Sequence, residues 1–463
     1  MAIIEAGTHQ FDVLRDRIRG HVVPAGDSRY EEACSAWALA AEQHPAAVAY
    51  PADAGDVVEI VTYARNAGLQ VTAQGSGHNA AAHGNRLAES ILVKTSELRE
   101  VSVDSEAQIA RVGAGALWLD VAPVAAAHGL AALAGSSPDV GVVGYTLGGG
   151  IGYLGRKHGL AGNSVTAIEL VTADGRLRRV DADNDPDLFW ALRGGGGNYG
   201  IVVAMEFRLY PVEELNAGML LWPVEDAARV YKAWRDWTET VPDEVTSMAR
   251  MIQFPPFPGV PEPLRGRHMM VVSAAFLGGA EAAAELLEPL RALAPELDMF
   301  GPMPVEGLLR LHGDPEQPTP GCSEHALIDE LPDEAIDALV ERAGAGSGSP
   351  LVVFELRHLG GALGRASEGD GALERVDGRF LAFTVGVIMD PARAQAIGQA
   401  AREAMEVLAP YSRGRTYLNF SERVTSTRSA FSVETHARLE DAKAAYDPDC
   451  VFHGNHRIGS ATA

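Results

Sequence analysis

The spacing of hydrophobic and polar positions predicts short helices and strands in mixed order over the first 213 residues. Apolar side chains recur at helical intervals through residues 11–45 and again through 53–68, which predicts helices in both ranges. Short apolar runs then predict strands at LQVTAQ, ILVKT, EVSVD and QIARVGAG. The run IELVTADGRLRRV alternates on both sides of Asp174-Gly175, as expected of a β-hairpin.

The pattern changes near residue 214, where the predicted strands become longer and alternate with amphipathic helices. This order is typical of an α+β domain with a largely antiparallel sheet. Two proline-rich stretches, 254–263 and 312–321, are expected to be surface loops at the rim of that sheet, with a functional lid as the alternative. The predicted division of the chain is into residues 1–213, 214–408 and 409–463.

Composition and charge limit the partners, the metal and disulfide sites and the cellular location that are expected for this protein. Acidic residues outnumber basic ones by 62 to 38, the formal net charge is −24, and no basic run offers a patch for nucleic acid. The three cysteines, Cys34, Cys322 and Cys450, form no CxxC pair, so neither a disulfide framework nor a metal site is expected. No secretory signal is visible in the first 25 residues, and no apolar stretch of about 18 residues predicts a membrane span. A cytoplasmic protein is therefore expected.

Glycine-rich loops are the most informative local feature. The loop Gly75-Ser76-Gly77-His78-Asn79 follows a predicted strand, and its glycines would let backbone amides approach an anion closely. A plain tight turn with an incidental histidine is the alternative. The second glycine-dense region, 135–162, contains the loop 148–152 and also suggests close approach to a ligand, with glycine-rich packing as the alternative.

The third loop, at 195–200, satisfies the GxGxxG pattern but not its structural context. A dinucleotide-binding fingerprint follows a strand and opens a helix. Here DPDLFWALR is helical before the loop, and IVVAMEFRLYPV alternates like a strand after it. A Rossmann site is therefore rejected, and no GxxxxGK[ST] sequence indicates a nucleoside triphosphatase.

Together with the C-terminal region, these loops resemble one family. The specific segments are GSGHN, SSPDVGVVGYTLGGGIGYLGRKHGLAGNSV, DPDLFWALRGGGGNYGIV and YDPDCVFHGNHRI, in family order. The chain resembles the FAD-linked oxidases of the vanillyl-alcohol-oxidase fold (PCMH type), in the berberine-bridge-enzyme-like branch. The resemblance implies a two-lobed FAD-binding domain in 1–213 and an inserted antiparallel-sheet substrate domain flanked by helices in 214–408. It further implies that 409–463 returns to the flavin.

The resemblance also implies how the cofactor is held. His78 stands where the family's histidine bonds to the 8α carbon of FAD, and imidazole is a competent nucleophile near neutral pH. Ser137 replaces the cysteine that forms a second link in many members, so a single covalent bond is predicted. Val140 stands where the family's oxidases tend to have valine, which favours an oxidase over a dehydrogenase. The residues expected at the FAD are Gly75, Ser76, Gly77, His78, Asn79, Ser137, Val140, Gly141, Val142, Gly144, Gly148, Gly149, Asn163, Gly200, Ile201 and Asn455.

The chain departs from the family pattern at three positions. Gln74 stands where an arginine often precedes the histidine loop, and Lys94 stands where an aspartate often ends the next strand. Phe420 replaces a tyrosine that is often invoked as the catalytic base. A mechanism that relies on that tyrosine therefore cannot be carried over to this chain.

Candidate catalytic residues follow from strand alternation. In PLVVFELRHLGG, Glu355 and Arg357 lie on one face of the predicted strand, where they could hold a polar substrate or form a solvent-facing ion pair. Tyr417 and Asn419 also alternate onto one side, in the segment expected to return to the flavin. Asn419 is predicted to contact substrate or flavin, and Tyr417 to act as an acid, base or orienting group. Without a tyrosine at 420, an amine substrate or a base elsewhere is favoured.

The resulting expectation is an FAD-dependent oxidoreductase. It would transfer a hydride from a small alcohol, amine or sugar-like metabolite to covalently bound flavin, which O2 would reoxidise. A flavin-dependent oxidative cyclase and a non-catalytic flavin-binding protein are the alternatives. The sequence leaves the substrate and the oligomeric state open, a homodimer included.

Overall fold

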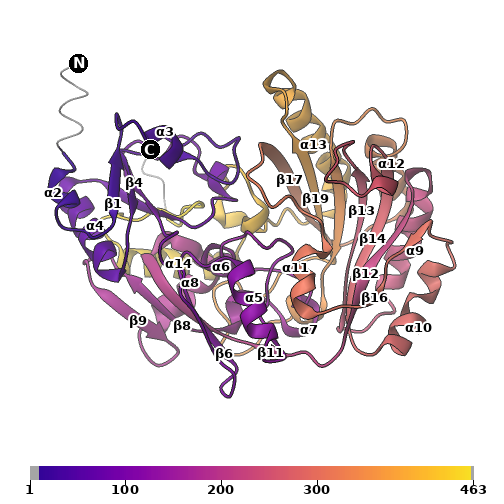
Figure 1. Ribbon diagram of the computed structural model, residues 1–463, viewed down its shortest axis with the longest axis horizontal. Coiled ribbons are helices and arrows are strands. Elements are labelled where there is room, and N and C mark those ends of the chain that lie inside the picture. Colours follow the sequence, from indigo (N-terminus) through magenta and orange to yellow (C-terminus); the bar gives the residue numbers. More distant parts are fainter. Residues whose placement is uncertain (1–9, 460–463) are drawn as a thin grey trace.

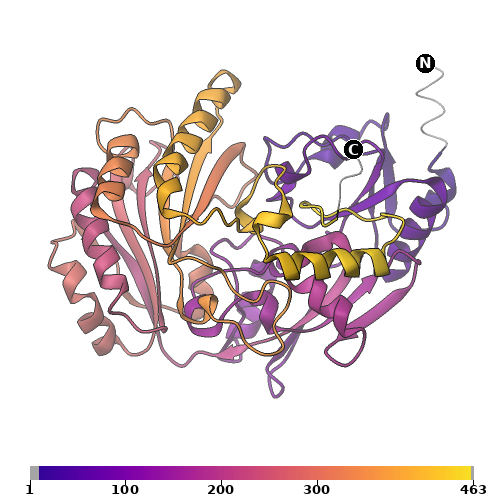
Figure 2. The ribbon, with the colours of Figure 1, turned by 180° about the vertical axis from the view of Figure 1, so that it is seen from behind.

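Two blocks of sheet and helix lie side by side, and the chain crosses from the first to the second near residue 212 (Figure 1). The structure is a computed structural model that describes residues 10–459. The second block runs from Leu215 to Leu408, after which the chain returns to the first block (Figure 2). The predicted α+β class is confirmed, with antiparallel sheets in both blocks.

The first lobe of the first block is a four-stranded sheet in the order β1-β2-β4-β3. Its elements are α2 (Asp12–Arg15), β1 (His21–Pro24), α3 (Tyr30–Cys34), β2 (Ala47–Tyr50), α4 (Ala54–Ala67), β3 (Gln70–Gln74) and β4 (Ser90–Lys94). Helix α4 begins where the Asp53 side chain accepts a hydrogen bond from the Asp56 amide, and it ends at Gly68 with a φ of +68°. Since β3 and β4 are parallel, the GSGHN loop leaves the sheet at the carboxyl edge of both strands.

The second lobe is an antiparallel sheet of five strands in the order β5-β6-β10-β8-β9. The predicted hairpin joins β8 and β9, and Gly175 takes a φ of +77° at its turn. The elements of this lobe are β5 (Val101–Asp104), β6 (Ile109–Gly113), α5 (Trp118–Ala126), β7 (Leu130–Ala131), α6 (Val142–Leu147), α7 (Gly155–His158), β8 (Val165–Val171), β9 (Leu177–Asp181), α8 (Pro186–Gly195), β10 (Ile201–Arg208) and β11 (Tyr210–Pro211).

The second block is built on an eight-stranded sheet whose main path is β15-β12-β14-β13-β18-β19-β17. Helices α9, α10, α12 and α13 cover its outer face (Figure 1). The elements of this block are β12 (Leu215–Pro223), α9 (Ala227–Thr238), β13 (Val245–Gln253), β14 (His268–Leu277), α10 (Ala280–Arg291), β15 (Leu297–Asp298), β16 (Gly301–Pro302), α11 (Leu308–Leu311), β17 (Gly321–Ile328), α12 (Asp333–Ala343), β18 (Val353–His358), β19 (Phe380–Val387) and α13 (Ala394–Leu408).

The two faces of this large sheet have different surroundings. Side chains such as Trp222, Phe354 and Phe380 point outward and are buried beneath the helices, with Trp234 of α9 among them. The alternate residues face the first block, where the Tyr153 hydroxyl lies 3.3 Å from the Ser273 hydroxyl on β14. The eight-stranded sheet therefore presents one face to the block that contains the glycine loops.

The C-terminal segment returns to the first block, and α14 (Val433–Tyr446) lies along it (Figure 2). The buried Asp447 carboxylate accepts hydrogen bonds from Lys443 and from the amide of Val451, which fixes the turn after the helix. The chain then bridges to β3 through Val71 and Phe452. None of the helices in residues 10–459 is long and apolar enough to cross a membrane.

The predicted helix over residues 11–45 is wrong for most of that range. Only α2 and α3 are helical there, β1 lies between them, and residues 35–46 form neither helix nor strand. The apolar side chains of β1 pack on both of its faces, Val22 against the core beneath α4 and Val23 beside α3. Pairing with β2 therefore overrides the local helical spacing.

Candidate functional site

His78 lies at the carboxyl end of β3 in a polar and aromatic setting. The Ser76 hydroxyl is 2.8 Å from Nδ1, and Oδ1 of Asp139 is 3.6 Å from Nε2. The Trp37 ring stacks on the imidazole with 4.1 Å between centroids and an interplanar angle of 16°. One face and both nitrogens of His78 are therefore positioned by neighbouring side chains.

Asp139 is the charged neighbour of this histidine. Its carboxylate accepts hydrogen bonds from Ser137 Oγ at 2.8 Å and from Trp37 Nε1 at 2.5 Å. Burial raises the pKa of Asp139, but its contacts with His78, Ser137 and Trp37 outweigh this, so that the pKa lies below its usual value. Asp139 is therefore a carboxylate at neutral pH, and Ser137 is a partner of that carboxylate.

The loops around His78 fit a flavin nucleotide. Gly75 and Gly144 are exposed, and a side chain added at Gly144 would meet nothing within 4 Å. Buried polar atoms without a hydrogen-bond partner include Nε2 of His78, Oδ1 of Asn79 and Oγ1 of Thr146. Open glycine backbone beside unpaired polar atoms suits the phosphates and ring heteroatoms of FAD, and requires no Lys or Arg.

Other predicted cofactor glycines are required by the packing of the chain itself. A Cβ at Gly148 would lie 1.8 Å from Oδ1 of Asn419, and one at Gly149 would lie 2.6 Å from Leu373. Gly77 is closed in by Ala36 and Gln74, and Gly200 by the Val171 carbonyl. Glycine-rich packing, the alternative kept open from the sequence, therefore accounts for part of these loops.

The remaining predicted cofactor residues fall into two groups. The side chains of Val142 and Ile201 are buried in hydrophobic cores, so only their backbone could face a cofactor, whereas Val140 is half-buried. The Gly141 amide donates to Ser76 Oγ at 3.3 Å. Except for Ile201, these residues belong to the segments 75–79 and 140–149 around His78, which together are called the glycine cradle.

Asn455 and Asn163, which were both predicted to bind the cofactor, join segments that are distant in the sequence. Asn455 Nδ2 donates to the Asn79 carbonyl at 2.7 Å, which ties the C-terminal segment to the histidine loop. Asn163 accepts from the Gly371 amide at 3.0 Å and donates to the Glu374 carbonyl at 3.2 Å. Its amide group therefore holds the loop 371–374 of the second block.

Glu355 lies at the centre of a buried charged cluster on the sheet face that looks toward His78. It is 0% exposed and hydrogen bonds to the Arg357 guanidinium and to His312 Nε2. Arg250, paired with Glu355 across β13 and β18, has its Nε 3.9 Å from the same carboxylate. His312 Nδ1 is 2.6 Å from Asp314. The solvent-facing ion pair that the sequence left open is therefore excluded.

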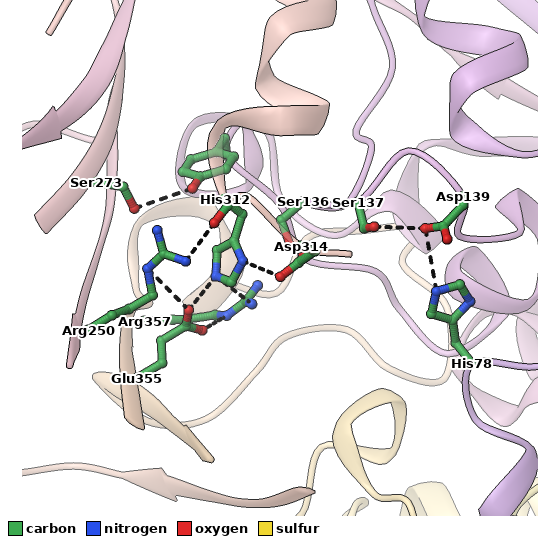
Figure 3. A network of polar contacts seen from close by, with 11 residues as sticks. His78, Ser136, Ser137, Asp139, Arg250, Ser273, His312, Asp314, Glu355 and Arg357 are labelled. Atoms are coloured by element: carbon green, nitrogen blue, oxygen red, sulfur yellow. Dashed lines mark hydrogen bonds and ion pairs between the residues drawn. The ribbon is translucent and has the colours of Figure 1, made fainter. Parts of the chain in front are cut away.

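The cluster reaches toward the histidine loop. Figure 3 shows the Glu355 group and the His78 group on either side of Ser136 and Asp314. Ser136 Oγ donates to Asp314 Oδ2 at 3.4 Å, and the next residue, Ser137, binds Asp139. The large sheet of the second block and the histidine loop thus meet at this pair of serines.

Both carboxylates of the cluster stay ionised. Burial raises the pKa of Glu355, but the charges of Arg357 and His312 outweigh burial and hold that pKa far below its usual value. The pKa of Asp314 is lowered in the same way, against burial, by His312 and Arg357. Glu355 is therefore a poor proton acceptor, and its negative charge holds the neighbouring Arg357 and His312 side chains in place.

Tyr417 and Asn419 lie together, but in a turn. The segment expected to be extended contains the 3₁₀ turn Leu418–Phe420 because the Phe420 amide bonds back to the Tyr417 carbonyl. Asn419 Nδ2 donates to the Tyr145 carbonyl at 2.8 Å and lies 3.4 Å from the Tyr417 hydroxyl. Burial raises the pKa of Tyr417 well above 10, so its phenol is protonated at neutral pH.

Sequence reasoning missed several members of the site. His312 and Asp314 belong to the proline-rich stretch expected to be a surface loop, yet His312 is buried in the charged cluster. The His-x-Asp spacing was the only local signal there. Asp139 lies inside the SSPDVG segment that carried the resemblance, whereas Trp37 and Arg250 carried no local signal.

Buried histidines beside the cradle give the protein a pH dependence. Burial, together with nearby cationic groups, lowers the pKa of His83 and His453 to about 3, and burial lowers that of His456 to about 4. The unfolded chain protonates these rings near pH 6.5. Stability from the neutral rings is thus complete above pH 6.5 and is lost as the pH falls toward these lowered values.

Replacing His453 with glutamine should therefore flatten the acid side of the stability curve. Between pH 6.5 and 5.5 we expect the variant to lose about 1 kcal/mol less free energy of unfolding than the wild type. Urea denaturation at the two pH values measures this. Equal losses in the two proteins would show that His453 does not titrate on unfolding.

Comparisons with known proteins agree with this architecture. Residues 45–181 match the FAD binding domain family. The chain is 26% identical over 448 residues to the uncharacterized FAD-linked oxidoreductase YgaK of Bacillus subtilis (strain 168), covering 95% of this chain and 96% of that protein.

Two solved structures superimpose on both blocks. The structure of 6-hydroxy-D-nicotine oxidase from Arthrobacter nicotinovorans has a TM-score of 0.83 and 26% identity, covering 96% of this chain and 98% of that one. Physcomitrella patens BBE-like 1 has a TM-score of 0.84 and 22% identity, covering 97% of this chain and 99% of that one. The latter likeness shows the fold alone.

Proposed function

We propose that the chain is an FAD-linked oxidoreductase of the vanillyl-alcohol-oxidase fold, in the berberine-bridge-enzyme-like branch, and that it is an oxidase with covalently bound FAD. It transfers a hydride from a small organic substrate to the flavin, and O2 takes the electrons from the reduced cofactor. The FAD supplies the two-electron chemistry, and the protein supplies binding, orientation and proton handling.

The observation that carries the proposal is the position of His78 in the glycine cradle. Its Nδ1 lies 2.8 Å from the Ser76 hydroxyl, and its buried Nε2 makes no hydrogen bond but lies 3.6 Å from the Asp139 carboxylate. A neutral imidazole held in this way is a nucleophile near pH 7. Ser137 gives no second attachment point because its hydroxyl is bound to Asp139. One bond, through His78, is therefore proposed.

The other loop residues hold the cofactor without covalent bonds. Exposed backbone at Gly75 and Gly144 and the unpaired amide oxygen of Asn79 offer polar contacts beside His78. Asn455 keeps the C-terminal segment against this loop. Half-buried Val140 leaves little bulk beside the flavin, which supports access for O2.

The substrate binds between the cradle and the charged face of the substrate-domain sheet. Arg357 stacks over Phe420, with its guanidinium carbon 4.9 Å from the ring centroid, so a cation and an aromatic ring share this region. Glu355 holds Arg357 and His312 in place and stays ionised. A hydroxyl or amine of the substrate can hydrogen bond to this group.

The proposed substrate is an amine or an alcohol. Since Glu355 and Tyr417 both have pKa values that make them poor bases at neutral pH, an amine is favoured, because a neutral amine releases hydride without a strong base. Asn419, held by the Tyr145 carbonyl, orients Tyr417 beside the cradle.

Replacing Tyr417 with phenylalanine should have a small kinetic effect. The hydroxyl accepts a hydrogen bond from Asn419 and does not accept the substrate proton, so we expect kcat to fall by less than about tenfold. Steady-state oxygen consumption measures this. A loss above about 100-fold would assign proton transfer to Tyr417.

Anaerobic mixing with a panel of amines, alcohols and sugars tests the oxidase proposal. A true substrate bleaches the flavin absorbance, and admission of air restores it with formation of hydrogen peroxide. No bleaching across the panel would favour a non-catalytic flavin protein. A cyclised product, seen by mass spectrometry, would indicate an oxidative cyclase.

A further inference from the structure

Asp139 and Trp37 form a support for His78 that cofactor binding alone does not require. Trp37 covers one face of the imidazole and also donates Nε1–H to Asp139 Oδ2. The other carboxylate oxygen, Oδ1, lies 3.6 Å from His78 Nε2 and accepts the Ser137 hydroxyl. These contacts join residues more than 100 positions apart in the sequence around one ring.

We propose that Asp139 is a positioning residue for the self-catalysed attachment of FAD, an inference that rests on the proposed covalent bond at His78. Its carboxylate, 3.6 Å from Nε2, favours the tautomer with the proton on that nitrogen, which leaves the Nδ1 lone pair as the nucleophile. The Asp-His-nucleophile logic is that of hydrolytic triads, except that the imidazole itself attacks.

The position of Ser76 shows which side of the imidazole Nδ1 occupies. The Ser76 hydroxyl lies 2.8 Å from Nδ1 and accepts the Gly141 amide at 3.3 Å, so it fixes the ring on that side, and any hydrogen bond that it donates to Nδ1 must open before the lone pair can attack. Nδ1 is therefore the nitrogen on the side of the two glycine loops, whereas Nε2 faces the carboxylate. The bond is thus assigned to Nδ1.

The attachment step balances with dioxygen as the oxidant. A bond forms between Nδ1 and the 8α carbon, and one C–H bond at that carbon breaks. The proton from this carbon and the proton on Nε2 are released, and the two electrons left on the flavin reduce O2 to hydrogen peroxide. While Nδ1 bonds, positive charge develops on the imidazole, and the adjacent Asp139 carboxylate stabilises it.

Asp139 is well suited to this role because it remains ionised. Its hydrogen bonds lower its pKa in spite of partial burial. The nearest other carboxylate of the cluster, Asp314, is bound to His312 and to Ser136. Asp139 is thus the carboxylate that faces His78 among the described residues of this network (Figure 3).

The test uses full-length apoprotein from a riboflavin-starved auxotroph, mixed with FAD in air. Two quantities are followed: total FAD bound, from absorbance, and FAD that precipitates with the protein in acid. For Asp139→Asn we expect ordinary binding and attachment slowed by about 100-fold. Asp139→Glu should recover part of the rate. Asp104→Asn, at the exposed last residue of β5, is the matched control and should attach FAD at the wild-type rate.

Trp37→Phe keeps an aromatic ring on His78 but removes the hydrogen bond to Asp139, and about fivefold slower attachment is expected. If Asp139→Asn fails to bind FAD, the attachment rate of Trp37→Phe tests the role of Asp139 instead. Wild-type attachment rates in Asp139→Asn, or in Trp37→Phe when the first variant does not bind, would overturn the role of Asp139. Wild-type protein that binds FAD but never attaches it would instead refute the covalent bond itself.

Discussion

FAD is expected to bind the His78→Ala variant but to separate from it completely on acid precipitation. Alanine removes the proposed nucleophile and leaves the glycine cradle, whose open backbone at Gly75 and Gly144 is independent of the imidazole. Ser137 cannot supply another covalent bond. The yellow colour should therefore move entirely from the pellet to the supernatant, which absorbance of the two fractions measures.

His128→Ala is the matched control for this variant. His128 is exposed after α5, in the second lobe of the same block, so its loss should leave FAD in the pellet. Acid-stable flavin in His78→Ala would contradict the assignment of the bond to His78. Loss of acid-stable flavin in both variants would point to a general defect of folding.

The Glu355→Gln variant is expected to lose about 3–5 kcal/mol of unfolding free energy. The amide keeps the shape of the side chain but removes the negative charge that faces Arg357 and His312. Arg250 and Arg357 are 2% and 6% exposed, so water cannot replace the lost carboxylate. Urea denaturation of the FAD-loaded proteins at pH 7 measures the difference.

Glu244→Gln provides the comparison at the surface. Glu244 pairs with Lys157 at 2.6 Å, but both side chains are partly exposed, so a loss below about 1 kcal/mol is expected. Equal stability losses in the two variants would contradict the view that Glu355 is the counterion that holds the buried cluster together.

Local patterns predicted the parts of the fold whose partners are near in sequence. Asp53 and Gly68 mark the ends of α4, and the β8–β9 hairpin turns at Asp174-Gly175. Alternation along β18 also separated Glu355 from Phe354 correctly, because a strand with one face under helices must alternate. Periodicity was sufficient wherever one face of an element is buried.

The charged cluster could not be predicted in the same way. Arg250 meets Glu355 only because β13 pairs with β18 in one register, across about 100 residues of chain. His312 enters from a proline-rich loop whose composition indicates only a surface connection. Such contacts depend on tertiary pairing, and no local spacing encodes them.

Only part of the site around His78 could be predicted from the sequence, for a related reason. GSGHN marked His78, because glycines before a histidine at a strand end are a local pattern. Trp37 comes from a segment expected to be helical, and it reaches the imidazole only because the chain after α3 is irregular. The incorrect helix prediction for residues 11–45 therefore also prevented the prediction that Trp37 packs on His78, the proposed nucleophile.

The most direct test of the proposed covalent flavin is the mass of the denatured wild-type protein, combined with digestion to locate the modified peptide. We expect the mass of the chain plus one FAD less two hydrogens, with the modification on the peptide that contains His78. Protein with the mass of the bare chain, and with its flavin free in solution, would contradict the covalent bond.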